Sequence, residues 1–101
     1  MMKAPWHIRK ATNTMAIDFP NSSRSYDATR NAVQFWGHDR IMESSFFVTA
    51  DALKQMQPDL QSGADALLRV FDDNRSRIYT TAARVYARGR KNAYNIYAAD
   101  L

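Results

Sequence analysis

Residues whose types could do chemistry lie close together in residues 35–45, which read FWGHDRIMESS. A histidine beside an aspartate, with two serines following, could supply a general base, its orienting carboxylate and a nucleophile. Side chains of adjacent residues such as His38 and Asp39 point apart in most turns, however, and the two serines fall within an apolar, strand-like stretch. We interpret Gly37–Arg40 as a hairpin connection in which Gly37 takes a positive φ and His38 lies at an exposed tip. We therefore expect no catalytic residue in this stretch.

Basic side chains concentrate later in the chain and form a second candidate site. Residues 69–91 contain seven basic and two acidic residues, so much of the net charge of +4 belongs to this segment. Cations near a helix C-terminus are favoured by the helix dipole, which is one explanation. Contact with an anion or with nucleic-acid phosphates is the other. The candidates for such contacts are Arg77, Arg84, Arg88, Arg90 and Lys91. The helical period places the first three in one row, in which Arg84 and Arg88 have no acidic partner nearby in the sequence.

Arg75 differs from these arginines because it falls within the apolar arc of the same predicted helix. A guanidinium group is costly to bury without a partner. Asp72, three residues earlier, is the nearest carboxylate, and Asp27 or Asp39 from a loop would serve equally well. We interpret Arg75 and Asp72 as a structural ion pair, with ligand binding as the alternative role of Arg75.

The strands that must position these residues follow from alternation of apolar and polar side chains. Residues 15–19 alternate before Pro20 and predict a first strand. Residues 25–26 and 32–36 predict a pair of strands, and residues 41–48 predict the partner across the hairpin. Residues 93–98 alternate again and predict a last strand.

Two helices are predicted between the last two strands. Thr49 can cap a short helix that Pro58 ends. Residues 62–65 have capping-box spacing and introduce one long helix over residues 63–88, with Gly89 as its stop signal. Its apolar face comprises Leu67, Phe71, Ile78, Ala82 and Val85. The order β-β-β-β-α-α-β predicts an α+β fold, with a small antiparallel sheet of about four strands covered on one face by the two helices.

The composition limits the organisation of the chain. A length of 101 residues suits one domain, which we place at residues 15–101. Residues 1–14 show no sustained period and are interpreted as an N-terminal extension; an ordered segment is the alternative. Met15 could be the natural start of the core.

Several classes of protein are disfavoured. The chain has no cysteine, and its two histidines are too far apart to suggest a metal site, so we expect no metal and no cofactor. No apolar run approaches the ~20 residues that span a bilayer, and no secretory signal is evident. We expect a cytoplasmic protein that does not contact membranes.

Five short stretches resemble a known family. They read FPNSSRSYD, FWGHD, FFVTADAL, FDDNRSRI and VYARGRKNAYNI, in that order. Together they are similar to the small bacterial family called domain of unknown function 1488, from about Met15 to Leu101. The resemblance implies a compact bacterial α+β protein and implies no activity, because the family is itself uncharacterised.

Three functional hypotheses remain. The first is a non-catalytic interaction module that forms a homodimer through exposed aromatic residues such as Trp36 and Tyr97 on the uncovered sheet face. The second is a nucleic-acid-binding accessory or regulatory protein that uses the basic end of the long helix, with weak binding. The third is an enzyme, for which the sequence offers no constellation.

Overall fold

The computed structural model describes residues 17–61 and 63–101 of the chain. The proposed extension, residues 1–14, lies outside the described residues. The strands are β1 (Ser25–Asp27), β2 (Ala32–Asp39), β3 (Met42–Thr49) and β4 (Ala93–Ile96). The helices are α2 (Ala50–Met56), α3 (Ala64–Asp73), α4 (Arg75–Ala87) and the 3-10 turn η2 (Ala98–Asp100).

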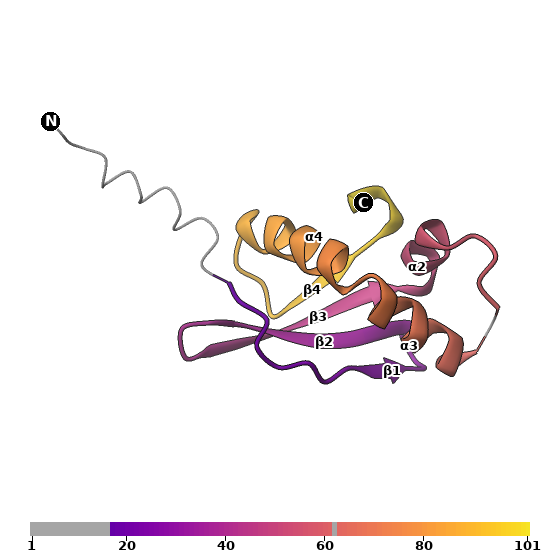
Figure 1. Ribbon diagram of the computed structural model, residues 1–101. Coiled ribbons are helices and arrows are strands. Elements are labelled where there is room, and N and C mark those ends of the chain that lie inside the picture. The colour runs from indigo at the N-terminus through magenta and orange to yellow at the C-terminus, as the bar shows by residue number, and fades with distance from the viewer. Residues whose placement is uncertain (1–16, 62) are drawn as a thin grey trace, which may run out of the picture.

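One four-stranded sheet, in the order β1-β2-β3-β4, forms one layer of the molecule. Helices α2, α3 and α4 lie on one face of this sheet (Figure 1). The predicted α+β class is confirmed. The fully antiparallel sheet is wrong, because β4 pairs with β3 in parallel. The three helices between β3 and β4 provide the long crossover that a parallel neighbour requires.

The core lies between the sheet and the helices. Alternate residues of β2 and β3, such as Phe35 and Phe46, are fully buried, and their rings stack at 5.4 Å between centroids. Phe71 of α3 packs against Phe35 at 5.1 Å. All five residues of the predicted apolar helix face are buried.

The long helix predicted over residues 63–88 is two helices, separated at Asn74. Asn74 leaves the helical conformation (φ −124°, ψ 23°), and its side-chain amide donates to the carbonyl of Val70 at 2.8 Å. Asparagine competes in this way with the backbone ladder, which explains the break. The N-cap of α3 is Gly63, without a side-chain cap, and Ser62 lies outside the described residues. The short helix is as predicted, with the Thr49 hydroxyl accepting from the N–H of Ala52.

The hairpin is tighter than the sequence suggested. Strand β2 continues to Asp39, and the turn consists of Arg40, at φ 60°, and Ile41. Gly37 therefore lies inside β2 and is buried, so its predicted role in the turn is wrong. His38 is likewise a strand residue, half-buried rather than at a tip.

The first predicted strand, residues 15–19, is reduced in the described residues to a single bridge. The N–H groups of Asp18 and His38 each donate to the other residue's carbonyl, both at 2.8 Å. This bridge brings Ile17 and Phe19 over Gly37. A β-carbon on Gly37 would lie 2.8 Å from Cε1 of Phe19 and 2.9 Å from Cδ1 of Ile17. Close approach of side chains, and not backbone conformation, is the reason for glycine here.

Candidate functional site

The strand geometry separates the histidine and the aspartate that could have acted together as a catalytic base and its orienting carboxylate. His38 pairs with Glu43 across the hairpin, with Nε2 and Oε2 3.4 Å apart. Asp39, the next residue, belongs to the opposite face of the strand, and its carboxylate accepts from the Tyr86 hydroxyl at 2.6 Å. Asp39 therefore holds a tyrosine and does not orient His38.

The tyrosine held by Asp39 is electrostatically perturbed. The hydrogen bond to the Asp39 carboxylate, together with partial burial, raises the pKa of Tyr86 to about 12, although the nearby charge of Arg90 acts in the opposite direction. Tyr86 is thus a hydrogen-bond donor at neutral pH. No local pattern indicated this contact, because the two residues are 47 positions apart.

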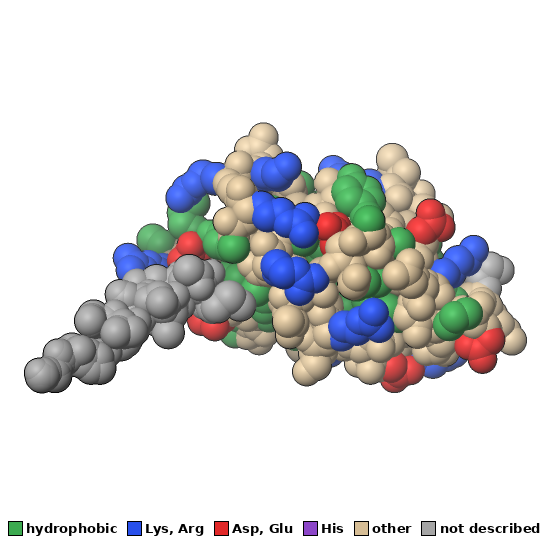
Figure 2. Space-filling model, turned by 90° about the horizontal axis from the view of Figure 1, so that it is seen from above, with side chains coloured by type: hydrophobic (Ala, Val, Ile, Leu, Met, Phe, Trp, Pro, Cys, Tyr) green, Lys and Arg blue, Asp and Glu red, His purple; other side chains and the backbone are tan. Residues whose placement is uncertain are grey.

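The five predicted basic residues are all exposed, on α4 or just after it. Lys and Arg side chains are spread across the helix-covered face of the molecule (Figure 2). Two members of the row are engaged by the C-terminal turn. Nη1 of Arg88 lies 2.9 Å from Oδ1 of Asp100, and Nη2 of Arg84 donates to the Asp100 carbonyl at 2.6 Å. Neither arginine has an acidic partner nearby in the sequence, but the fold supplies one for Arg88 from Asp100, 12 residues away.

The carboxyl group of Asp100 has a lowered pKa, which favours its charged form. Partial burial tends to raise the pKa of its carboxyl, but hydrogen bonds from the Tyr97 N–H and from Arg88 outweigh burial, so the pKa lies below its ordinary value. Asp100 is an anion that ties the C-terminal turn to α4. Among the described residues, Arg77, Arg90 and Lys91 form no ion pair.

Arg75 and Asp72 lie together, as their spacing of three residues predicted. Nη2 of Arg75 lies 2.7 Å from Oδ1 of Asp72 and 2.9 Å from the Ser22 carbonyl, while Nη1 donates to the Tyr79 hydroxyl at 2.7 Å. Arg24, 48 residues before Asp72 and so without a local sequence signal, binds the same carboxylate through two hydrogen bonds of 3.0 and 2.8 Å. The hydrogen bonds from Arg24 first, and then from Arg75, hold the pKa of Asp72 below its ordinary value. The network joins α3, α4 and the segment before β1.

The sheet face away from the helices, called the outer face below, carries a different set of residues. The row formed by Trp36, Ser45 and Ala93 crosses β2, β3 and β4, as the register shows. Phe47 lies in the next row and is only 5% exposed, because the Arg30 guanidinium stacks 4.0 Å from its ring centroid.

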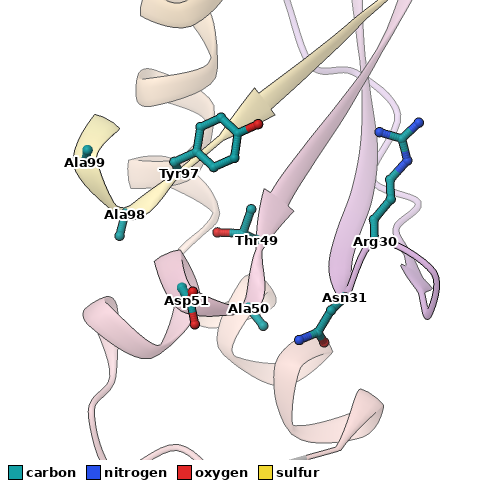
Figure 3. Close-up of a pocket in the computed structure, with 8 residues that line it drawn as sticks. All are labelled: Arg30, Asn31, Thr49, Ala50, Asp51, Tyr97, Ala98 and Ala99. Atoms are coloured by element: carbon teal, nitrogen blue, oxygen red, sulfur yellow. The ribbon is translucent and has the colours of Figure 1, made fainter.

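A cavity of ≈ 420 Å³ adjoins this region, where β3 ends and α2 begins. Figure 3 shows Arg30 and Tyr97 on opposite sides of it, with Thr49 between them. Tyr97 is 55% exposed. Within the described parts of the chain, no group of three His, Asp or Glu residues could hold a metal ion.

These features define a class: a two-layer α+β domain with one mixed four-stranded sheet and helices on one face. The chain belongs to the family described as "Protein of unknown function (DUF1488)", whose model matches residues 17–97. No match among curated proteins was found.

A solved structure with the same fold comes from the DUF1488 family of Shewanella loihica PV-4 and is described as a protein of unknown function. It superposes with a TM-score of 0.72 over 81% of this chain and 92% of the other, at 14% sequence identity. In the part of the chain that the structure describes, no helix is long and apolar enough to cross a bilayer.

Proposed function

We propose that this protein is a non-catalytic interaction module that acts as a homodimer through the outer face of its sheet. The observation that carries the proposal is the arrangement of layers, in which the described helices α2, α3 and α4 cover one face of the sheet (Figure 1). The other face carries the partly exposed Trp36 and the exposed Tyr97. Exposed aromatic side chains are favoured contact residues at protein interfaces. The proposed module needs no cofactor.

A second copy is the partner that this face suits best. Along its central row a large side chain, Trp36, is followed by the small Ser45 and Ala93. In a twofold dimer each copy presents the same patch to the other. The indole of one copy can then rest over the two small residues of its partner, so the row is complementary to itself.

A charge at the centre of this row should separate the subunits. We expect Ser45→Glu to weaken self-association at least about tenfold, since the new carboxylate would be desolvated without a partner. The matched control is Ser76→Glu, which adds the same charge to an exposed position in the first turn of α4. Size-exclusion chromatography with light scattering at micromolar concentration measures the mass of each variant, and circular dichroism checks the fold. Equal effects of the two changes, or none from Ser45→Glu, would count against the outer face.

The second candidate is a nucleic-acid-binding accessory or regulatory protein, favoured by one observation. Residues 74–99 contain six basic and no acidic residues, and Arg77, Arg90 and Lys91 form no ion pair with any described residue. Three phosphate contacts would give a slope of about −3 for log affinity against log salt on duplex DNA.

We expect this binding to be weak, independent of sequence and lost near physiological ionic strength. The double change Arg90→Glu with Lys91→Glu should abolish it, as fluorescence anisotropy with a labelled duplex would reveal. The absence of binding at low salt, or binding unaffected by the double change, would rule out a nucleic-acid interface at these cations.

A further inference from the structure

A second cavity, called the terminal cavity here, lies where the far end of the β2–β3 hairpin meets the loop after α4. Its volume is ≈ 330 Å³, at the lower end of the range for small-molecule sites. The side chains of Asp39 and Ser44 share the helix-facing side of the hairpin, because β2 and β3 alternate in register with Phe35 and Phe46. Tyr86 and Arg90 line the cavity from the helix side. Asp39, Ser44 and Tyr94 belong to the helix-facing side of the sheet, opposite the outer face, so ligand binding here does not require dimer formation.

The polar groups of the terminal cavity are held in place by bonds within the protein. The Tyr86 hydroxyl donates to Oδ2 of Asp39 at 2.6 Å, which fixes that carboxylate and leaves Oδ1 as an acceptor. The N–H of Lys91 donates to the Tyr94 hydroxyl at 3.0 Å. The rings of Tyr86 and Tyr94 lie 5.2 Å apart, and Tyr94 also stacks on Phe46 at 5.0 Å. Asp39, Tyr86 and Tyr94, called the floor of the cavity below, are therefore pre-organised.

Tyr94 supplies the observation that points to a ligand. Its side chain is only 1% exposed, yet it lines the cavity. The hydroxyl accepts one bond, from Lys91, but no described residue accepts the hydroxyl hydrogen. Buried polar groups are nearly always satisfied, so a donor left over at a cavity wall is suited to an acceptor that enters from outside.

The charges around the terminal cavity select the class of that ligand. Arg90 and Lys91 are adjacent and exposed at its rim, and they pair with no described carboxylate. Two cations side by side match the double charge of a phosphate monoester better than a single carboxylate. Two carboxylates, Asp39 and Glu43, also line the cavity and would repel an anion. The phosphate must therefore lie at Arg90 and Lys91, and the part of the ligand near Asp39 must carry hydroxyl donors.

We propose that the terminal cavity binds a small phosphate ester that carries hydroxyl groups. Its phosphate contacts Arg90 and Lys91 at the rim. Its hydroxyls bond to the free oxygen of Asp39 and to the Tyr94 hydroxyl at the floor. Such an ester can be a free sugar phosphate or the 5′-phosphorylated end of a ribonucleotide chain, which share this chemistry.

Titration of ribose 5-phosphate into the ¹⁵N-labelled full-length protein tests the proposal. We expect amide shifts at Ser44, Lys91 and Tyr94, with affinity about tenfold tighter than for either inorganic phosphate or ribose alone, since only the ester reaches both ends of the cavity. A short 5′-phosphorylated RNA that competes with ribose 5-phosphate would identify a nucleic-acid end as the source, and a lack of competition would favour the free metabolite. An absence of shifts at these residues in the wild type, or equal affinity for phosphate alone, overturns the proposal.

A matched pair of variants locates the binding. Tyr94→Phe keeps the ring packing and removes the hydroxyl, so ribose 5-phosphate binding should weaken about tenfold, as expected for one hydrogen bond to a polar ligand. Tyr97→Phe removes the hydroxyl of an exposed tyrosine beside the other cavity and should leave the affinity unchanged. Similarly, Arg90→Gln should weaken binding and Arg77→Gln should not. If the two variants of each pair had equal affinity for ribose 5-phosphate, the ester would bind elsewhere. The exposed arginine pair keeps this test valid even if Tyr94→Phe lowers the stability of the fold.

Discussion

Replacement of Gly37 by valine should lower the free energy of unfolding by about 3 kcal/mol, whereas His38→Asn should change it by less than about 0.5 kcal/mol. The β-carbon alone would meet Phe19 and Ile17 at 2.8 and 2.9 Å. Cδ1 of Ile17 is the end of a flexible chain and can move aside. The Phe19 ring cannot move easily, because it stacks on Tyr79 with 4.5 Å between ring centroids.

Urea unfolding followed by circular dichroism measures both variants. Gly37→Ala should fall between them, since it adds the β-carbon without the two further methyl groups. His38→Asn removes only a 3.4 Å contact with the exposed Glu43 and keeps the backbone bridge to Asp18. If His38→Asn proved as damaging as Gly37→Val, the close packing over Gly37 would be refuted as the reason for this glycine.

Replacement of Arg75 by methionine should cost about 2 kcal/mol at neutral pH, because it leaves several polar groups without their partner. In the wild-type protein the guanidinium donates hydrogen bonds to the Asp72 carboxylate, the Ser22 carbonyl and the Tyr79 hydroxyl. Methionine retains the contact of the apolar stem with neighbouring rings. The control is Arg77→Met on the same helix, an exposed position where the change should be close to neutral.

The cost of Arg75→Met should also depend on pH. The pKa of Asp72 is lowered in the folded protein, first by Arg24 and then by Arg75. Its ion pairs therefore stabilise the fold fully at pH values above the ordinary pKa of 3.8. This stabilisation is lost as pH falls through the folded pKa. The difference between wild type and Arg75→Met should therefore shrink in acid, which unfolding curves at neutral pH and below pH 3.8 can measure. A difference that is constant over this range would mean that Asp72 contributes little to the network.

The parts of the fold that could be predicted from the sequence depend on local pattern. Alternation identified the buried side of β2 and β3, Thr49 marked the start of α2, and the helical period identified the buried face of α3 and α4. The break at Asn74 was missed because its side chain satisfies a carbonyl within an otherwise continuous helical pattern. The parallel pairing of β4 was missed because strand direction depends on where the crossover returns, which no local pattern encodes.

In the candidate sites, too, local contacts could be predicted from the sequence and long-range contacts could not. The pairing of Arg75 with Asp72 was accessible because the two residues are one helical turn apart. Asp100 meets Arg88 only because η2 returns to α4 after β4. Gly37 was assigned to a turn from its residue type, whereas its role follows from a segment 18 to 20 residues earlier that pairs with β2. The missed contacts of Asp100 and of Gly37 join residues that are close in space and distant in the chain.

Sedimentation equilibrium of the wild-type protein is the decisive test of self-association through the outer face. At micromolar concentration we expect a mass near twice 11.6 kDa, which falls towards the monomer value on dilution. A mass of 11.6 kDa at every concentration in the micromolar range would rule out the dimer.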